Sequence, residues 1–278
     1  MFRILTKQML NPTICKMVVE APRIAASALP GQFLIVRTDE QGERIPLTIS
    51  DFDRKAGTVT IVIQPIGKST RHMVDDFAEG DSFADVVGPL GNASDFVSMS
   101  PGELAGKRYV FIGGGLGTAP VYPQVKWLHE HGVAVDVIVG ARTKDLIIYE
   151  EEFKSVCDHL YICTDDGSYG FKGVGTAQLE ALAAAGEKYT NAVAIGPMIM
   201  MKFSTLTCVK LGIPIMVSMN TLMVDGTGMC GACRLSVGGQ TKFACVDGPE
   251  FDGALVDFDE AMRRNGQYKE EEAKAYGK

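Results

Sequence analysis

Short runs of hydrophobic and β-branched residues recur through the first 100 positions and are separated by Pro, Gly and Asp. Runs of this length and composition are typical of β-strands joined by turns. We expect strands, in chain order, at MFRILTKQML, ICKMVVEA, QFLIVRT, PLTISDF, TVTIVIQPI and SFADVVGPL. Between the last two, Ser69 to Ala78 fits a helix that begins near a Ser/Thr cap and ends before Gly80. The pattern therefore predicts a small antiparallel β-barrel.

From about residue 101 the pattern changes to strands that alternate with longer helical segments. The predicted strands are YVFIGG, VAVDVIVGAR, HLYICTDDG and AVAIGPM. The predicted helices run through Trp127 to near Gly132, over 145–157, over 176–185, and from the fourth strand through Leu211. This alternation predicts a second domain of the α/β class, with a doubly wound parallel sheet.

The first α/β strand leads into a glycine-rich turn that consists of Gly113, Gly114, Gly115, Leu116, Gly117 and Thr118. Such a turn lets a dinucleotide diphosphate approach the backbone at the N-terminus of the next helix. The spacing departs from G-x-G-x-x-G, and a purely structural strand-to-helix turn fits the same residues. The turn is therefore a candidate diphosphate site whose support must come from its surroundings.

Near the C-terminal end, Asp225, Cys230, Cys233 and Cys245 follow the spacing D-x4-C-x2-C-x11-C. The plant-type [2Fe–2S] loop has the spacing C-x4-C-x2-C…C, so here an aspartate replaces the first cysteine. Glycines at 226, 228 and 231 suit a loop that folds tightly around a cluster. Two alternatives remain: a glycine-rich turn with unrelated buried thiols, and a structural zinc site in a binding module without enzymatic activity.

Three short motifs mark the barrel region. Pro30-Gly31-Gln32-Phe33 turns directly into a strand, and Pro46, Leu47, Thr48, Ile49 and Ser50 offer hydroxyls and amides on the following strand. Gly67, Lys68, Ser69 and Thr70 open the predicted helix. A glycine, a lysine and two hydroxyls at a helix N-terminus suit a diphosphate. Each motif taken alone is explained equally well by a turn or a capped helix.

Composition excludes several classes of function. The chain of 278 residues has a net charge of −7, which disfavours nucleic acid and anionic membranes as partners. No hydrophobic run reaches transmembrane length, and the N-terminus lacks the core of a signal peptide. Seven cysteines in such a chain favour a reducing compartment, and we expect the cytoplasm. Cys15, Cys157, Cys163 and Cys208 are scattered and are expected to be core thiols.

The segment LMVDGTGMCGACRLSVGGQTKFACVDGPEF resembles the end of electron-transfer subunits related to ferredoxin reductase. One such group is the electron-transfer subunit of bacterial dihydroorotate dehydrogenase, which normally has four cysteines. The other is the small subunit of NADH-dependent ferredoxin:NADP oxidoreductase, also described as sulfide dehydrogenase. In that group an aspartate takes the first ligand position, as Asp225 does here, so the resemblance favours the second group over the first.

The resemblance implies an FAD site on the barrel. In this family PGQF opens a strand, R-P-x-[ST] lies beside the isoalloxazine and G-x-x-T holds the diphosphate, which assigns these roles to 46–49 and 67–70. Gly88-Pro89-Leu90-Gly91 resembles the turn that closes the domain. One position departs from the pattern: Ile45 replaces the family arginine and Arg44 comes one residue early. Arg44 is therefore not expected to reach the flavin phosphates, and Lys68 is a candidate for part of that charge.

The resemblance also implies an NAD(H) site on the α/β domain. It places Gly113 to Thr118 near the diphosphate, Asp165 and Asp166 at a strand end facing the cofactor, and Gly196, Pro197 and Met198 near the nicotinamide. A helix-capping turn is the alternative explanation of the aspartate pair. The acidic pair and the family favour NADH, whereas Arg142 could pair with the 2′-phosphate of NADPH.

We therefore expect four regions: an FAD-binding barrel over 1–100, an NAD-binding domain over 101–220, a [2Fe–2S] module over 221–250 and a charged tail over 251–278. The implied function is that of an electron-transfer subunit that exchanges a hydride between NAD(H) and FAD and passes single electrons through the cluster. The implied partner in a heterodimer or larger complex is a large flavin- and iron–sulfur-containing subunit that performs electron bifurcation. No side chain is expected to act as a general acid or base.

Overall fold

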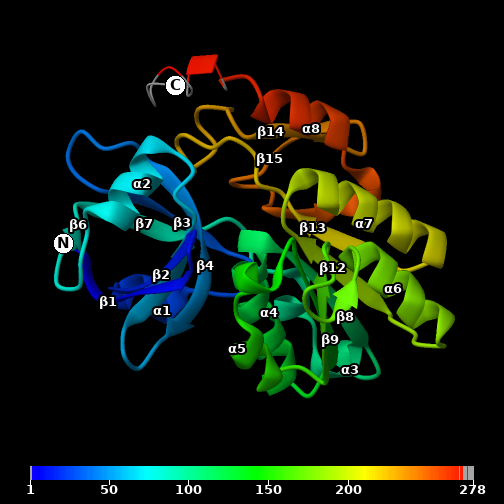
Figure 1. Ribbon diagram of the computed structural model, residues 1–278. Coiled ribbons are helices and arrows are strands. Elements are labelled where there is room, and N and C mark those ends of the chain that lie inside the picture. The colour runs from blue at the N-terminus through cyan, green and yellow to red at the C-terminus, as the bar shows by residue number, and fades with distance from the viewer. Residues whose placement is uncertain (1, 269, 272–273, 275–278) are drawn as a thin grey trace. The chain divides into compact units, whose positions relative to one another are not determined.

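The computed structural model describes residues 2–268, 270–271 and 274, and these form two compact units (Figure 1). The first, here called the barrel unit, comprises the chain up to Asn92, residues 220–249 and the described residues from Asp257 onward. The second, here called the sheet unit, comprises Ala93–Met219 and Glu250–Val256. The segment that contains Asp225, Cys230, Cys233 and Cys245 thus belongs to the same unit as the barrel.

Within the described residues, the barrel unit contains a strongly curved sheet of seven strands. They are β1 (Phe2–Asn11), β2 (Ile14–Glu20), β3 (Phe33–Arg37), β4 (Ile45–Asp53), β5 (Thr58–Ile63), β6 (Ser82–Phe83) and β7 (Asp85–Leu90). Their order in the sheet is β6-β1-β2-β5-β4-β3-β7, and each neighbouring pair is antiparallel. All the strands expected from the first 100 residues are present.

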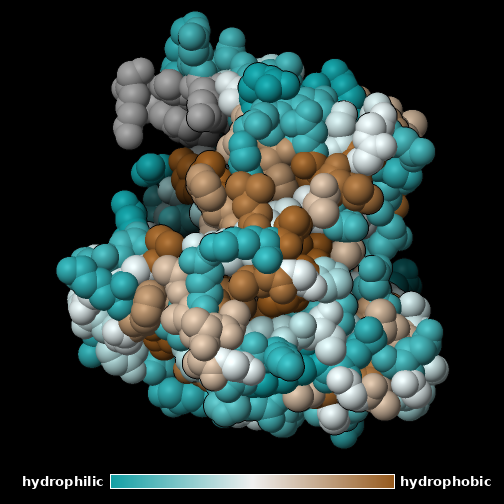
Figure 2. Space-filling view, turned by 90° about the vertical axis from the view of Figure 1, so that its right-hand side faces the viewer, coloured by the Kyte–Doolittle hydropathy of each residue, from teal (hydrophilic) through white to brown (hydrophobic). Residues whose placement is uncertain are grey.

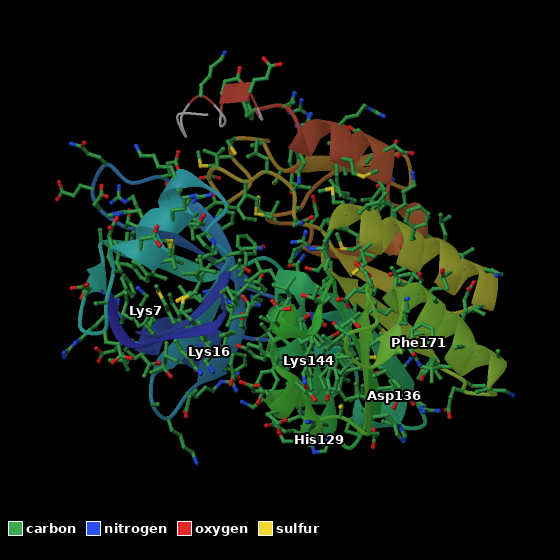
Figure 3. The ribbon with its side chains drawn as sticks, viewed as in Figure 1. Lys7, Lys16, His129, Asp136, Lys144 and Phe171 are labelled. Atoms are coloured by element: carbon green, nitrogen blue, oxygen red, sulfur yellow. The ribbon has the colours of Figure 1, made fainter. Side chains whose placement is uncertain are left out.

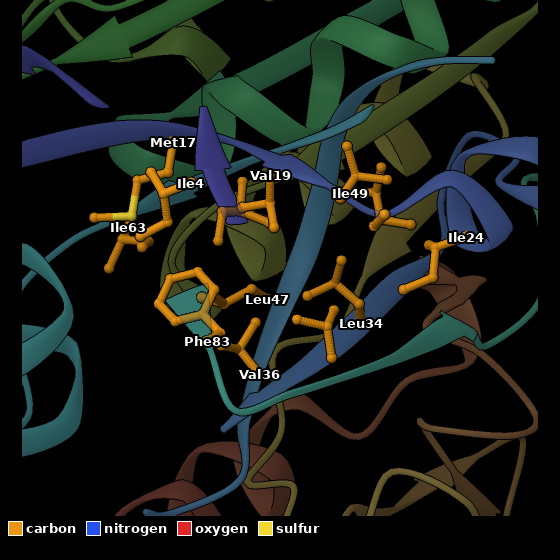
Figure 4. Close-up of a cluster of buried hydrophobic side chains, with 14 of the residues drawn as sticks. Ile4, Met17, Val19, Ile24, Leu34, Val36, Leu47, Ile49, Ile63 and Phe83 are labelled. Atoms are coloured by element: carbon orange, nitrogen blue, oxygen red, sulfur yellow. The ribbon is translucent and has the colours of Figure 1, made fainter. Parts of the chain in front are cut away.

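Alternating hydrophobic positions build the barrel core. In β2, the buried side chains Cys15, Met17 and Val19 occupy every second position. They meet Ile4, Leu34, Ile49, Ile63 and Phe83 in one cluster (Figure 4). Burial of a side chain of this size contributes about 1.5–3 kcal/mol, so the alternation fixes which face of each strand points inward.

Two short helices within the first 92 residues also belong to the barrel unit. The predicted helix is α2 (Lys68–Asp75). Lys7 Nζ donates to the Val74 carbonyl in its last turn and to the Phe77 carbonyl just after the helix, each at 2.5 Å (Figure 3 labels Lys7). The other helix, α1 (Pro22–Ser27), was not expected from the sequence. The PGQF motif has a structural role: the Gln32 amide donates to the Gly91 carbonyl and its oxygen accepts from the Leu29 amide.

The sheet unit is a doubly wound α/β sheet, as predicted. Its strands are β8 (Arg108–Gly114), β9 (Ala134–Ala141), β10 (His159–Thr164), β11 (Phe171–Lys172), β12 (Asn191–Ile195), β13 (Ile215–Ser218) and β16 (Glu250–Asp252). The order among the described residues is β11-β10-β9-β8-β12-β13-β16, with only β16 antiparallel to its neighbour. The helices are α3 (Pro101–Leu104), α4 (Thr118–Glu130), α5 (Glu150–Lys154), α6 (Gly175–Ala184) and α7 (Met198–Leu211).

Two features of the sheet unit differ from the expected elements. The helix expected over 145–157 is limited to α5, because Tyr149 adopts a left-handed backbone with φ 63° immediately before it. The segment Glu250–Asp252 was assigned across the cluster module and the tail, yet it forms β16 on β13. A three-residue strand has too few positions to show a period of two, so only the pairing with β13 identifies it.

Helix α7 is apolar on more than one side. Met201 and Cys208 are buried against the sheet, while Phe203, Leu206 and Val209 are between 53% and 56% exposed. Figure 2 faces the side on which α6 and α7 lie in Figure 1, and hydrophobic residues gather near the middle of that face. The helix therefore lacks the amphipathic pattern that marks most surface helices.

A buried carboxylate ties together the amino ends of three neighbouring segments of the sheet. Asp136 on β9 is fully buried and accepts hydrogen bonds from Arg108 Nη2 at 2.6 Å, Tyr189 OH at 2.8 Å and His159 Nδ1 at 2.9 Å (Figure 3 labels Asp136). These partners satisfy the charge, as a buried carboxylate requires. The network lies at the opposite end of the strands from the glycine-rich turn.

No helix in the described part of the chain is long and apolar enough to cross a membrane. The residues after β16 begin with a 3₁₀ turn (Gly253–Leu255) and helix α8 (Phe258–Asn265). The charged tail expected over 251–278 includes positions 269, 272–273 and 275–278, which lie outside the described residues.

Candidate functional site

The carboxyl end of β8 and that of β12 meet at the switch point of the doubly wound sheet. Helix α4 follows β8 and lies with α5 on one face of the sheet. Helix α7 follows β12 and lies with α6 on the other face (Figure 1). In sheets of this kind, the crevice outside the strand ends at the switch point is where ligands bind. The two glycine-containing turns singled out from the sequence, at 113–118 and 196–198, both lie at this point.

Close packing between the two turns requires glycine. A Cβ on Gly117 would lie 2.6 Å from Gly196 Cα, and a Cβ on Gly196 would lie 2.8 Å from Met200 Cε. Gly115 is different, because it has φ +55° and nothing within 4 Å of the position where a Cβ would be. Gly115 therefore leaves open space at the start of α4, where a diphosphate could approach the backbone amides.

Three residues after Gly115, the start of α4 carries a buried hydroxyl without a hydrogen-bond partner among the described residues. Thr118 is the first residue of α4 and is 1% exposed, and its Oγ1 has no hydrogen-bond partner among the described residues. An orphaned buried hydroxyl at a helix N-terminus is a ready donor for an anionic ligand. The residues of the turn therefore fit a dinucleotide diphosphate.

Asp165 and Asp166 follow β10 at the same carboxyl edge and are exposed. The Asp165 amide donates to Ala141 and the Asp166 amide to Arg142, so Arg142 lies on the adjacent strand end. Asp166 Oδ1 also accepts from the Ser168 amide at 2.9 Å, and hydrogen bonds from Ser168 lower the pKa of Asp166. Asp166 thus accepts a hydrogen bond within the turn after β10 and does not cap a helix. Because its pKa is lowered, its carboxylate is charged at neutral pH.

The flavin motif on β4 divides its residues between two faces. Leu47 and Ile49 point into the barrel core, whereas Pro46 and Thr48 are partly exposed on the outer face. A planar ring could lie on that outer face against backbone and hydroxyl. At α2, Thr70 Oγ1 accepts from the Gly67 amide, Ser69 donates to Glu43 and Lys68 is exposed. The cradle over 67–70 stays a prediction, with both hydroxyls already engaged.

The loop from Asp225 to Cys233 turns through three left-handed glycines: Gly226 (φ 81°), Gly228 (φ 89°) and Gly231 (φ 66°). Cys233 and Cys245 are each 2% exposed, and their sulfur atoms are 3.3 Å apart. Cys230 is exposed. In the described part of the chain no three metal-binding side chains lie close enough together to hold an ion without rearrangement. The structure therefore pairs two of the four proposed ligands, and the full set stays a prediction.

Backbone amides in this loop point at sulfur. Hydrogen bonding from the Ala232 amide lowers the pKa of Cys230. Burial, together with the neighbouring Cys233, raises the pKa of Cys245 to about 12, although the Gly228 amide opposes this. If both of these buried sulfur atoms are thiolates, their negative charges favour binding of a cation between them. Three thiols, a carboxylate and amides directed at sulfur fit an iron–sulfur cluster.

The side chain of Asp225 also shapes the loop. Its Oδ2 atom accepts hydrogen bonds from the Thr227 amide at 2.9 Å, the Thr227 hydroxyl at 2.6 Å and the Met229 amide at 3.2 Å. These bonds, with those from Thr227 first, lower the pKa of Asp225. The carboxylate is therefore charged at neutral pH, and all three of these bonds use the same oxygen atom.

A hairpin and helix α8 hold the loop from one side, which the sequence analysis missed. The hairpin consists of β14 (Arg234–Val237) and β15 (Gln240–Phe243). Arg264 of α8 donates to the carbonyls of Arg234 and Ala232, and Asn265 Oδ1 accepts from the Leu222 amide. The signal for α8 in the sequence was the amphipathic segment after Asp257. The Asp257 carboxylate accepts a hydrogen bond from the Glu260 amide and so caps the helix.

The barrel holds the loop from the other side. A Cβ on Gly226 would lie 3.0 Å from Ile35 Cγ1, so the loop backbone lies directly against β3. The Asn92 amide donates to the Gly248 carbonyl at 2.7 Å, which fastens the segment after Cys245. Arg44 Nη2 donates to the Asp225 carbonyl at 3.2 Å. The contact of Arg44 is thus with the cluster loop, and its expected distance from the flavin phosphates stays a prediction.

Comparison with known proteins matches both the loop and the whole chain. A family model described as the iron–sulfur cluster binding domain of dihydroorotate dehydrogenase B matches residues 220–257. An uncharacterized protein of Clostridium beijerinckii is 58% identical over 276 residues, covering 99% of this chain and 93% of that protein. A Thermotoga maritima protein named as a homolog of the dihydroorotate dehydrogenase B (NAD(+)) electron transfer subunit is 47% identical over 258 residues, covering 93% of this chain and 88% of that protein.

One solved structure also matches over nearly the full length. Its description concerns flavin-based electron bifurcation via the NADH-dependent reduced ferredoxin-NADP oxidoreductase. The matched chain has a TM-score of 0.89 and 44% identity, and the match covers 99% of this chain and 96% of that chain. These comparisons confirm the resemblance inferred from the motifs.

Proposed function

Because the chain belongs to the family of dihydroorotate dehydrogenase B electron-transfer subunits and their homologues, we propose that it is the electron-transfer subunit of an NADH-dependent ferredoxin:NADP oxidoreductase. In this role it carries FAD and one [2Fe–2S] cluster and uses NAD(H). The observation that carries the proposal is the match over 99% of the chain to a structure of that oxidoreductase. The aspartate at position 225 supports the same group.

When bound, the nicotinamide and flavin supply hydride chemistry and the cluster supplies one-electron transfer. The chain's own residues bind and orient these groups. Thr118 and the amides at the start of α4 receive the dinucleotide diphosphate, and the outer face of β4 at Pro46 and Thr48 supports the flavin ring. Cys230, Cys233, Cys245 and Asp225 hold the cluster in the loop fastened between the barrel and α8.

Electrons leave or enter through a partner that docks on the cluster loop. Hydrophobic side chains surround the exposed Cys230: Val224 is 52% exposed, Met229 87% and Val246 44%. Exposed hydrophobic groups at such a position mark interaction surfaces. The relatives' names describe electron-transfer subunits, which act with a larger catalytic subunit, and we propose that this larger subunit holds the bifurcating flavin and further iron–sulfur clusters.

A second candidate is the electron-transfer subunit of dihydroorotate dehydrogenase itself. The observation in its favour is the family model that matches residues 220–257. The two candidates differ in the partner, because one larger subunit oxidises dihydroorotate and the other exchanges electrons with ferredoxin and NADP. All seven cysteines are free in the structure, which suits a reducing compartment such as the cytoplasm for either candidate.

Purification with the untagged partner from the native host, followed by cofactor analysis, tests the proposal. We expect this chain to carry FAD, two irons and two labile sulfides, and NADH to bleach the flavin under anaerobic conditions. The co-purified subunit should support NADPH-dependent ferredoxin chemistry and not dihydroorotate oxidation. A colourless chain with stoichiometric zinc would contradict the whole proposal, and a dihydroorotate-oxidising partner would select the second candidate.

A further inference from the structure

Arg44 joins the cluster loop to the strand that bears the flavin motif. It immediately precedes β4, whose residues 46–49 form that motif, and its Nη2 atom donates to the backbone carbonyl of Asp225 at 3.2 Å. Both residues belong to the barrel unit. The contact spans 181 positions of sequence, so the local sequence does not reveal it.

We propose that Arg44 is a positioning residue for electron transfer, which fastens the first ligand position of the cluster loop to the flavin-bearing strand and raises the reduction potential of the cluster by its charge. The inference rests on the proposed function, since it requires a cluster in the loop. It assigns a role to the arginine that stands one residue before the position of the family arginine.

The positioning part of the role follows from how few contacts hold the start of the loop. The Asp225 carboxylate turns inward to Thr227 and Met229 within the loop, so its hydrogen bonds do not connect it to the barrel. The carbonyl of Asp225 is the group that accepts from Arg44. Gly226, the next residue, lies against Ile35 and Leu90 of β3 and β7. Among the described residues, this hydrogen bond and this close backbone contact thus hold the start of the loop on the barrel.

The electrostatic part follows from charge balance. Reduction adds one negative charge to the cluster, and a guanidinium stays protonated at every working pH. A cation close to the group being reduced stabilises the reduced state, and net charge and solvent exposure are among the factors that set such potentials. Arg44 is partly exposed, so this stabilisation should decrease as salt screens it.

The test compares substitutions at the two ends of the same strand. Arg54 immediately follows β4 and donates Nη2 to the Ala28 carbonyl at 2.8 Å, so it makes the same kind of contact as Arg44. The nine residues of β4 lie between the two positions, and an extended strand of this length separates them by roughly 30 Å. Arg44→Gln and Arg54→Gln therefore remove the same charge near the loop and far from it, while Arg44→Lys keeps the charge.

Iron and sulfide content and the midpoint potential from EPR-monitored titration are measured for each purified protein. We expect Arg44→Gln to lower the potential or the cluster content, with a larger potential shift at low salt, and Arg44→Lys to stay closer to the wild type. Arg54→Gln should match the wild type. Wild-type content and potential in Arg44→Gln, or an equal change in Arg54→Gln, would overturn the inference. A wild-type protein without any cluster would overturn the proposed function instead.

Discussion

The carboxylate of Glu250 accepts a hydrogen bond from the side-chain amide of Gln124, with 2.6 Å between Nε2 and Oε1, and a second from Ser94 Oγ at 3.1 Å. Gln124 is 1% exposed, and Glu250 begins β16, the strand that returns from the cluster segment to the sheet unit. Burial, with a smaller contribution from the negative charge of Asp95, raises the pKa of Glu250 to about 7, although the hydrogen bonds from Ser94 and Gln124 oppose this. This carboxyl group therefore titrates near neutral pH in the folded protein.

Glu250→Gln should stabilise the protein at pH 8 but not at pH 5. An unfolded glutamate loses its proton near pH 4.3, whereas the folded protein keeps it up to about pH 7. In that window the folded state binds more protons, so the free energy of unfolding falls as pH rises, and the full penalty is present above pH 7. The glutamine keeps the acceptor oxygen and removes the charge, which predicts a gain of about 1–3 kcal/mol at pH 8.

Chemical denaturation at pH 5 and pH 8 measures this difference. Glu130→Gln is the matched control, because Glu130 is an exposed glutamate at the end of the same helix as Gln124. The control should show no pH-dependent difference from the wild type. A Glu250→Gln gain that is equal at both pH values would mean that this carboxyl does not titrate in the window.

Gly115→Val should impair NADH binding and leave the flavin in place. A valine at φ +55° strains the turn and fills the open position at the start of α4, so the diphosphate cannot approach closely. We expect NADH-driven flavin reduction to weaken by about tenfold or more, which corresponds to about 1.4 kcal/mol. Gly132→Val is the control, since Gly132 has φ +69°, equally open space and lies after the other end of α4. Loss of flavin in Gly115→Val, or equal impairment in both variants, would argue against the assigned site.

NADH should reduce the flavin faster than NADPH. At the proposed site, the exposed pair Asp165 and Asp166 would repel a 2′-phosphate at the same strand edge where Arg142 would attract one. Replacing both aspartates by serine should therefore raise the efficiency with NADPH by about tenfold while changing NADH little. Arg142→Ala should act in the opposite direction. Anaerobic stopped-flow reduction with each nucleotide decides the question, and faster reduction of the wild type by NADPH would refute the preference.

The sequence predicted those parts of the fold whose information is local. Alternation in segments such as ICKMVVEA fixes a strand and its inward face, and the change of period after residue 101 marks the α/β sheet. The cysteine spacing and three glycines likewise identify the loop, because φ > 0 is a property of single residues. The observed barrel, sheet and left-handed glycines agree with these expectations.

The other features of the fold and of the candidate site depend on contacts between residues that are distant in the sequence. β16 is a strand only because β13 offers an edge, and α5 is short because Tyr149 takes a left-handed backbone before it. The contacts of Arg44 with Asp225 and of Arg264 with Ala232 link positions far apart in the chain. No periodicity or spacing encodes such pairs, so the contacts that fasten the cluster loop were not predictable from one sequence, although the segment after Asp257 carried a signal for helix α8 itself.

The last prediction concerns the role of Asp225, for which two explanations make different forecasts. As an iron ligand, its carboxylate would be a harder donor than a thiolate, and ligand identity is one lever on cluster potential. As a turn residue, it would only accept the hydrogen bonds from Thr227 and Met229 that the structure shows. Those bonds use Oδ2, so both roles are compatible with one carboxylate.

Three substitutions separate the two roles. Asp225→Cys restores the four-cysteine spacing, so it should retain a [2Fe–2S] cluster with an altered EPR spectrum and midpoint potential, while flavin content stays normal. Asp225→Asn keeps an acceptor oxygen for the turn and removes the anionic ligand, so it should weaken cluster retention. Asp225→Ala removes both and should retain the least iron, because three thiolates would leave an open coordination position.

Thr227→Val is the matched control for the turn, since it removes the hydroxyl that donates to Asp225 at 2.6 Å and leaves the carboxylate intact. If Asp225 binds iron, this control should keep the wild-type EPR spectrum even if the loop is less stable. Wild-type spectra and potentials in both Asp225→Asn and Asp225→Cys would show that the carboxylate only shapes the turn. The fourth ligand would then have to come from another residue or from water.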